Sequence, residues 1–154
     1  MADGPPPGPA GDPYWLGLAC DLAALCPPSE TAFSVGAVIV AADGTELARG
    51  YSRESGPRDH AEEAALAKLG PSPALRDATI YSSLEPCGRR ASRPSPCADL
   101  ILAAGLPRVV QAWSEPDLFV AATGAVRLLA AGVELRELPE LADRARRPNR
   151  HLLD

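Results

Sequence analysis

The sequence predicts an α/β fold, a three-layer α/β/α sandwich around a mixed sheet of five strands. Two observations support this prediction. After an opening hairpin, strand-like apolar runs alternate with helical runs, a pattern typical of βα units with parallel strands and helices on both faces of the sheet. The length of 154 residues, with 46% apolar and 23% charged residues, fits one globular domain, because single domains cluster at about 100 to 200 residues.

The first helix is predicted over residues 14–25. Asp12 and Pro13 stand where a capping residue and a first-turn proline are common, so we expect Asp12 to be the N-cap. Pro27 and Pro28 should end the helix, since proline cannot continue one.

A β-hairpin should follow the first helix. Residues 33–40 form an apolar strand-like run, and Asp43-Gly44 is a two-residue turn signal that leads into a second strand ending near Tyr51. Beyond the hairpin, helical and strand-like runs alternate. The expected helices are residues 60–69, 98–104 and 118–131, and the expected strands are residues 79–84, 108–113 and 133–138.

Composition separates both ends of the chain from this domain, which we place at residues 13–140. Residues 1–12 are rich in Pro and Gly and should form a disordered tail. Residues 141–154 contain four arginines and should form a short helix or a solvated arm.

The net charge of −5 and the pI near 5.0 disfavour nucleic acid as a partner, because an acidic molecule repels phosphate backbones. No basic segment precedes an apolar run, and no apolar run reaches the ~18 residues of a membrane helix. We therefore expect no membrane contact and a cytoplasmic protein. In that reducing compartment the four cysteines should be thiols or metal ligands rather than disulfides.

Three candidate metal ligands fall at the boundaries of predicted elements: His60 starts a helix, Cys87 follows a strand, and Cys97 starts the next helix. One imidazole and two thiolates form a neutral ligand set for Zn²⁺ that leaves the fourth tetrahedral position free, as in catalytic zinc sites. Ser95 as N-cap would place Cys97 at a helix N-terminus, which stabilises a thiolate. Taken singly, each of these residues also fits a purely structural role.

Glu62 has two possible roles at the start of the same helix as His60. Because Cα–Cβ bonds tilt toward the N-terminus of a helix, the side chains of His60 and Glu62 can both project past that end, toward a metal and its water. Alternatively, Asp59 and Glu62 have the spacing of a capping box, in which Glu62 reaches back to the N–H of the cap residue.

The combined pattern, His-x-Glu followed by Pro-Cys and a second cysteine, is a signature of zinc-dependent base deaminases. Over residues 14–138 the chain resembles the cytidine-deaminase-like superfamily. The resemblance implies that His60, Cys87 and Cys97 hold one Zn²⁺ per chain. It also implies that Glu62 moves protons in the hydrolytic deamination of a small aminated heterocycle. Relatives usually form dimers or tetramers, so a homo-oligomer is implied as well.

Within this superfamily the chain is similar to the deaminase domain of the riboflavin-biosynthesis pyrimidine deaminases. Residues 88–96 separate the two cysteines, as a long loop does in those enzymes, although the histidine pair typical of that loop is absent. Downstream matches strengthen the similarity, among them Cys97-Ala98-Asp99, Arg108-Val109-Val110 and Glu115-Pro116. The reductase domain that accompanies many such deaminases has no room in 154 residues, so we expect the deamination step alone.

Three residues are candidate substrate contacts: Phe33, Ala61 and Arg93. Phe33-x-Val35-Gly36-Ala37 is similar to free-nucleoside deaminases, so Phe33 could face a pyrimidine ring; a core aromatic on the first strand is the alternative. Arg93 lies in the loop between the two cysteines, where it could bind a phosphate.

The leading prediction is therefore a zinc hydrolase that converts an exocyclic amine of an amino-pyrimidine ribosyl compound to a carbonyl with release of ammonia. The riboflavin-pathway diaminopyrimidine ribosyl phosphate is the leading substrate. The alternatives are a cytidine, deoxycytidylate or purine-base deaminase, which could act in specialised metabolism, and a catalytically silent, zinc-stabilised binding domain.

Overall fold

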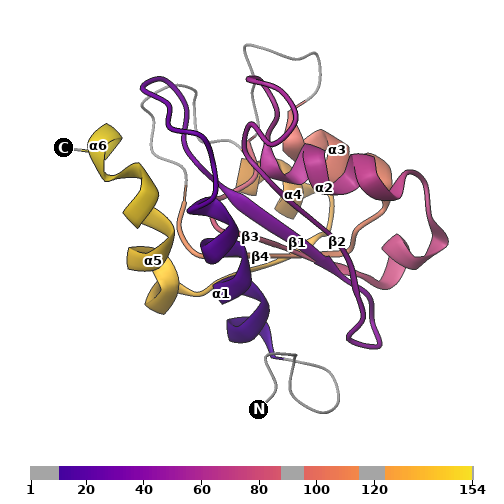
Figure 1. Cartoon of the computed structure of the whole chain (residues 1–154). Helices are drawn as coiled ribbons and strands as arrows, with labels where there is room; N and C mark the ends of the chain where they lie inside the picture. The colour runs from indigo at the N-terminus through magenta and orange to yellow at the C-terminus, as the bar shows by residue number, and fades with distance from the viewer. Residues whose placement is uncertain (1–10, 88–95, 115–123, 154) are drawn as a thin grey trace, which may run out of the picture.

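Five strands form one mixed sheet in the computed structural model, which describes residues 11–87, 96–114 and 124–153 (Figure 1). The strands are β1 (Gly36–Val40), β2 (Glu46–Tyr51), β3 (Thr79–Ser82), β4 (Arg108–Gln111) and β5 (Glu134–Glu137). Their order in the sheet is β2-β1-β3-β4-β5. β1 pairs antiparallel with β2 and β3, whereas β3, β4 and β5 are parallel. The predicted mixed sheet of five strands is confirmed.

Helices cover both faces of this sheet (Figure 1). On one face lie α1 (Asp12–Ala23) and α5 (Ala142–Arg146), and on the other lie α2 (Ala61–Leu69), α3 (Cys97–Ala104) and α4 (Gly124–Ala130). Shorter helical segments are the 3-10 helices η1 (Pro73–Asp77), η2 (Pro139–Leu141) and η3 (Arg147–Asn149) and the short α-helix α6 (Arg150–Leu153). The helices on the two faces confirm the predicted three-layer sandwich.

Two glycines let the helices pack closely on the sheet. A Cβ atom on Gly36 of β1 would lie 2.0 Å from the backbone oxygen of Ala19 in α1. A Cβ atom on Gly50 of β2 would lie 2.7 Å from the backbone oxygen of Ala61, the first residue of α2. All five residues of β1 are buried between these helices. β1 is therefore fixed against α1, and β2 is fixed against the start of α2.

The predicted cap of the first helix is wrong. Gly11, not Asp12, is the N-cap of α1. The carboxylate of Asp12 accepts hydrogen bonds from Tyr81 Oη at 2.6 Å, from Arg108 at 2.6 and 2.9 Å, and from Arg136 at 2.6 Å. Hydrogen bonds between a carboxylate and guanidinium groups are charge-assisted and belong to the strong hydrogen bonds of proteins. The hydrogen bonds from Arg108 outweigh burial and hold the pKa of Asp12 well below its usual range.

The first strand is shorter than predicted and begins at Gly36, because the N–H groups of Ser34 and Val35 donate to side chains. Ser34 N–H donates to Asn149 Oδ1 at 2.6 Å, and Val35 N–H donates to Ser52 Oγ at 2.9 Å. The residues after Leu141 form the short helices α5 and α6, so of the two forms considered for this end of the chain the helix is observed.

Parts of two predicted segments lie outside the described residues: residues 118–123 of the expected fourth helix and residues 1–10 of the expected tail. None of the helices in the described ranges is long and apolar enough to cross a membrane.

Candidate metal centre and active site

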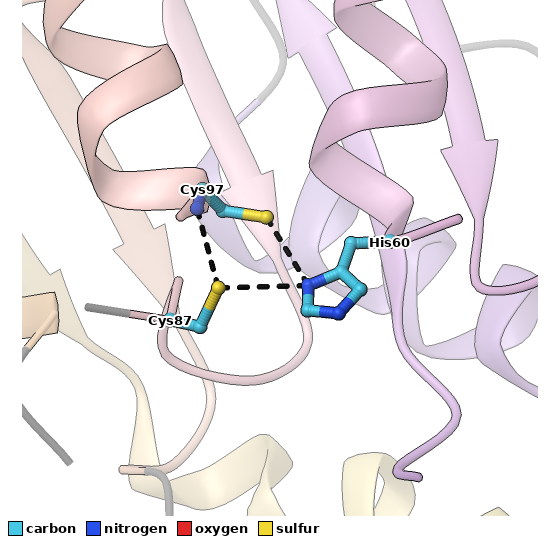
Figure 2. A group of neighbouring side chains, drawn as sticks. All are labelled: His60, Cys87 and Cys97. Atoms are coloured by element: carbon cyan, nitrogen blue, oxygen red, sulfur yellow. Dashed lines mark hydrogen bonds between the residues drawn. The ribbon is translucent and has the colours of Figure 1, made fainter. Parts of the chain in front are cut away.

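The three predicted metal ligands come together where three elements begin or end (Figure 2). His60 is the N-cap residue of α2, Cys97 is the first residue of α3, and Cys87 follows β3. Their nitrogen and sulfur atoms all lie within 4.8 Å of one another. His60 Nδ1 is 3.5 Å from Cys87 Sγ and 3.3 Å from Cys97 Sγ. The two sulfur atoms and Nδ1 therefore converge on one point.

The surroundings of Cys87 favour its thiolate form. The backbone N–H of Cys97, at the N-terminus of α3, donates to Cys87 Sγ at 3.2 Å (Figure 2). Hydrogen bonding with Cys97 and the neighbouring imidazole of His60 outweigh the cost of burial and lower the pKa of the Cys87 thiol. A thiolate is the form of cysteine that binds metal.

The donor set fits zinc. Thiolate sulfur and imidazole nitrogen are ligands that Zn²⁺ binds in proteins, whereas Mg²⁺ and Ca²⁺ prefer oxygen. Three protein donors also leave one tetrahedral position for water or substrate, as in catalytic rather than structural zinc sites. His60, Cys87 and Cys97 thus form a catalytic-type zinc site.

Glu62 is buried beside Ser82 and does not cap the helix. The capping-box interpretation of Glu62 is wrong, because the N–H of His60 donates to Oε1 of Glu63 at 3.3 Å. Glu62 is 3% exposed, and its Oε2 lies 3.0 Å from the hydroxyl of Ser82 at the end of β3. The side chain of Glu63 thus takes the capping role, which leaves the carboxyl group of Glu62 available for chemistry.

Burial favours the protonated form of the Glu62 carboxyl group. Removal from water raises the pKa of Glu62, and the negative charge of Cys87 raises it further. The Ser82 hydroxyl has one hydrogen for two acceptors, Leu84 O at 2.6 Å and Glu62 Oε2 at 3.0 Å. A protonated Glu62 can donate to Ser82 Oγ, which frees Ser82 to donate to Leu84. The site can hold Glu62 in either protonation state.

A family model for the cytidine and deoxycytidylate deaminase zinc-binding region matches residues 10–113. The chain belongs to this deaminase family. The resemblance predicted from the His-x-Glu and Pro-Cys pattern is confirmed, and with it the zinc-binding character of the site.

Two relatives are named as a pyrimidine deaminase and as a riboflavin biosynthesis protein. The diaminohydroxyphosphoribosylamino-pyrimidine deaminase of Schizosaccharomyces pombe is 42% identical over 115 residues, which are 73% of this chain and 28% of that protein. The riboflavin biosynthesis protein RibD of Escherichia coli is 40% identical over 102 residues, 66% of this chain and 26% of that protein. The chain thus spans about a quarter of the length of these relatives.

A solved structure shows the same fold. RibD of Acinetobacter baumannii superposes with a TM-score of 0.78 at 33% identity and covers 92% of this chain and 39% of its own. The cytidine-deaminase-like fold expected for the chain is therefore confirmed.

Of the three candidate substrate contacts, Phe33 and Ala61 are buried residues near the site, and the third is not among the described residues. Phe33 is 8% exposed and packs edge-to-face on Trp113, with ring centroids 5.8 Å apart. Ala61 is fully buried beside Gly50, next to both His60 and Glu62. Arg93 lies outside the described residues. Contact of these residues with substrate stays a prediction.

Sequence reasoning missed two residues that support the site. Ser82 bonds to Glu62, and Glu85 accepts a hydrogen bond at 2.8 Å from the N–H of Ala125 in α4. Beside this bond, Gly124 lies so close to the loop that a Cβ atom on it would lie 1.6 Å from Pro86 O. α4 therefore fixes the loop that ends at Cys87. No local signal marks Ser82, because a serine at the end of a strand is ordinary.

Proposed function

We propose that this protein is a zinc-dependent hydrolytic deaminase that acts on an amino-pyrimidine ribosyl compound. The observation that carries the proposal is a buried glutamate, Glu62, held beside a His/Cys/Cys set of ligands. A structural zinc site has no need of such a glutamate, and the three donors leave a position free. The silent binding domain is therefore disfavoured.

The reaction consumes one water and replaces a C–NH₂ group of the ring by a carbonyl, with loss of ammonia. Zinc, when bound by His60, Cys87 and Cys97, lowers the pKa of water and so supplies a nucleophile near neutral pH. In this proposal Glu62 Oε2 accepts one proton from the attacking water and delivers it to the ring nitrogen, and it then takes the second proton from the added hydroxyl group and delivers it to the departing amine, so that both hydrogens of the water are used and ammonia leaves. Ser82 holds that oxygen in place. Burial keeps bulk water away from the carboxyl group.

The riboflavin-pathway diaminopyrimidine ribosyl phosphate is the substrate that we propose. The relative at 42% identity is named a diaminohydroxyphosphoribosylamino-pyrimidine deaminase, and the relative at 40% identity is named a riboflavin biosynthesis protein. The family model, which matches residues 10–113, includes both Cys87 and Cys97.

Ammonia release from zinc-loaded protein tests the proposal. The panel comprises the diaminopyrimidine ribosyl phosphate, cytidine, deoxycytidylate and guanine. We expect turnover of the diaminopyrimidine and at most slow turnover of the others. Chelator-treated protein is the control and should be inactive. Full zinc occupancy without turnover of any compound would contradict the proposal and support a silent binding domain.

A nucleoside or nucleotide deaminase is the second candidate. Phe33, Val35 and Gly36 form a pattern similar to that of free-nucleoside deaminases, and Phe33 stands before β1. Turnover of cytidine or deoxycytidylate alone would favour this candidate over the first.

We also propose that the chain forms a homo-oligomer, a dimer or a tetramer. Val126 and Leu129 of α4 are 68% and 57% exposed, which is unusual for large apolar side chains one turn apart. Light scattering during gel filtration should give a mass of two or four chains, and a monomer that is active would contradict this. A cytoplasmic location remains a prediction.

A further inference from the structure

A buried asparagine near the C-terminus holds the backbone that carries Phe33. Asn149 is 1% exposed. Its Oδ1 accepts from Ser34 N–H at 2.6 Å, and its Nδ2 donates to Ser34 O at 3.0 Å. One side chain thus satisfies both backbone groups of Ser34, as a neighbouring strand would. Asn149 is 115 residues away in sequence, so this contact depends on the folded C-terminal segment, residues 142–153.

The same stretch is held from its other side by Arg53. The guanidinium of Arg53 donates to Phe33 O at 3.2 Å and to Ser34 Oγ at 2.6 Å. Arg53 itself has a φ of 60°, a conformation that non-glycine residues seldom adopt. The Phe33-Ser34 peptide is therefore bonded to Arg53, in the turn after β2, as well as to the C-terminal segment.

A second contact of the C-terminal segment fixes the aromatic partner of Phe33. The guanidinium carbon of Arg146 lies 5.0 Å from the ring centroid of Trp113, within cation–π range. Trp113 packs edge-to-face on Phe33, and its carbonyl accepts from the N–H of Glu85 at 3.0 Å. Since Glu85 is two residues before Cys87, Arg146, Trp113 and Phe33 form a stack that reaches the zinc loop.

The sheet places this stack at the edge where the chemistry occurs. β1 runs antiparallel to β3, with Ala37 opposite Ser82. The start of β1, preceded by Phe33, therefore lies beside the end of β3, where Ser82 meets Glu62. Gly36 N–H donates to Ser83 Oγ at 3.0 Å across the same edge.

We propose that the C-terminal segment is a positioning element for substrate binding. In this proposal Asn149 and Arg146 hold Phe33 and Trp113 as one apolar wall of the site, against which the heterocycle packs. Neither Asn149 nor Arg146 takes part in the reaction. The inference rests on the proposed deaminase function, and it assigns the C-terminal segment a role in ring recognition.

Variants Asn149→Ala and Arg146→Gln test this role, with Arg150→Gln, an exposed arginine of α6, as matched control. Each variant is zinc-loaded, and kcat and KM are measured with the diaminopyrimidine ribosyl phosphate. We expect KM to rise roughly tenfold in both test variants while kcat changes less than about twofold. Zinc content should stay at one per chain, and Arg150→Gln should match the parent. Arg146→Lys should restore part of the KM effect, since it keeps the cation.

Tryptophan fluorescence reports directly on the environment of Trp113, one of the two aromatic residues of the proposed wall. The chain has two tryptophans, so in a Trp15→Phe background the emission reports Trp113 alone. Arg146→Gln and Asn149→Ala should change this emission, and Arg150→Gln should not. If Asn149→Ala fails to fold, Arg146→Gln decides, because its side chain is 43% exposed and not part of the core.

Three outcomes would overturn the inference. The first is a KM in Arg146→Gln equal to that of Arg150→Gln. The second is a loss of zinc in the test variants, and the third is a fall in their kcat at unchanged KM. These differ from a failure of the proposed function, in which the parent chain itself releases no ammonia from any compound of the panel.

Discussion

Glu62 and Glu63 are neighbours in the first turn of α2, and the directions of their carboxyl groups separate their roles. Glu63 returns to the N–H of His60, whereas Glu62 is buried beside Ser82 and the zinc ligands. Burial raises the pKa of the Glu62 carboxyl group, so it holds its proton to higher pH than an exposed glutamate does. The pair thus provides a matched comparison of the proposed catalytic glutamate with a capping glutamate.

Glu62→Gln should keep zinc and lose activity. The amide preserves size and can still bond to Ser82, but it cannot carry a proton, so kcat should fall about a hundred- to ten-thousand-fold. Glu63→Gln is the control: it should retain kcat, and its melting temperature should fall only slightly. Measured kcat and zinc content check both variants. Near-parental turnover in Glu62→Gln with zinc bound would falsify the role of Glu62.

Gly124→Ala should weaken zinc binding from outside the ligand set. The added Cβ would lie 1.6 Å from Pro86 O, so the loop ending at Cys87 must move. We expect lower zinc affinity in a chelator competition as well as a lower melting temperature. Gly132→Ala is the control, because its φ of 87° strains an alanine while nothing lies within 4 Å of the new atom. Equal zinc affinity in the two variants would contradict the coupling of α4 to the site.

At the scale of elements, the order of helices and strands follows from local patterns, but their ends do not. The alternation of apolar runs and the Asp43-Gly44 turn are local, so the sandwich and the hairpin could be predicted. The residue at which β1 begins depends on Asn149, which bonds to Ser34 just before the strand. The role of Asp12 depends on Arg108 and Arg136. These partners are about a hundred residues away, and no local pattern marks them.

The metal ligands could be predicted for a different reason. Few residue types bind zinc, so His60, Cys87 and Cys97 were restricted by chemistry as well as by position. The choice between the two roles of Glu62 was not restricted in this way, because spacing allows both. Phe33 and Trp113 are ordinary apolar residues, so their pairing emerged only from the fold.

Asp12 joins the start of α1 to β3, β4 and β5, and this junction should depend on pH. The pKa of Asp12 is lowered in the folded state, mainly by Arg108. Its contribution to stability is therefore full above the unfolded pKa of about 3.9 and is lost as pH falls through the lower folded value. At pH 7, Asp12→Asn should lower the free energy of unfolding by about 1 to 3 kcal/mol.

Denaturant titrations at several pH values check the Asp12 prediction. The difference between parent and Asp12→Asn should shrink below about pH 4. Asp21→Asn is the control, since its exposed pair with Arg144 should contribute at most about 1 kcal/mol. A difference that stays constant down to pH 2 would count against the charged network.

For the whole molecule, zinc connects elements that are far apart in sequence. His60 belongs to the start of α2, Cys87 to the loop after β3, and Cys97 to the start of α3. The loop at Cys87 is also bonded to α4 through Glu85 and, through Trp113, to the C-terminal segment. A metal that holds these three ligands therefore stabilises the layer of helices on one face of the sheet together with the edge of the sheet beside it.

Removal of zinc should consequently lower global stability and not only activity. A ligand that binds only the folded state adds about 2.7 kcal/mol when its free concentration is ~100 times Kd. The stripped protein also keeps two thiols and an imidazole within 4.8 Å without the cation that holds them together. We expect calorimetry to show a lower melting temperature after chelation, restored by Zn²⁺ but not by Mg²⁺, which prefers oxygen ligands. An unchanged melting curve in protein proved metal-free by elemental analysis would mean that the helices and the sheet edge hold the site together without zinc.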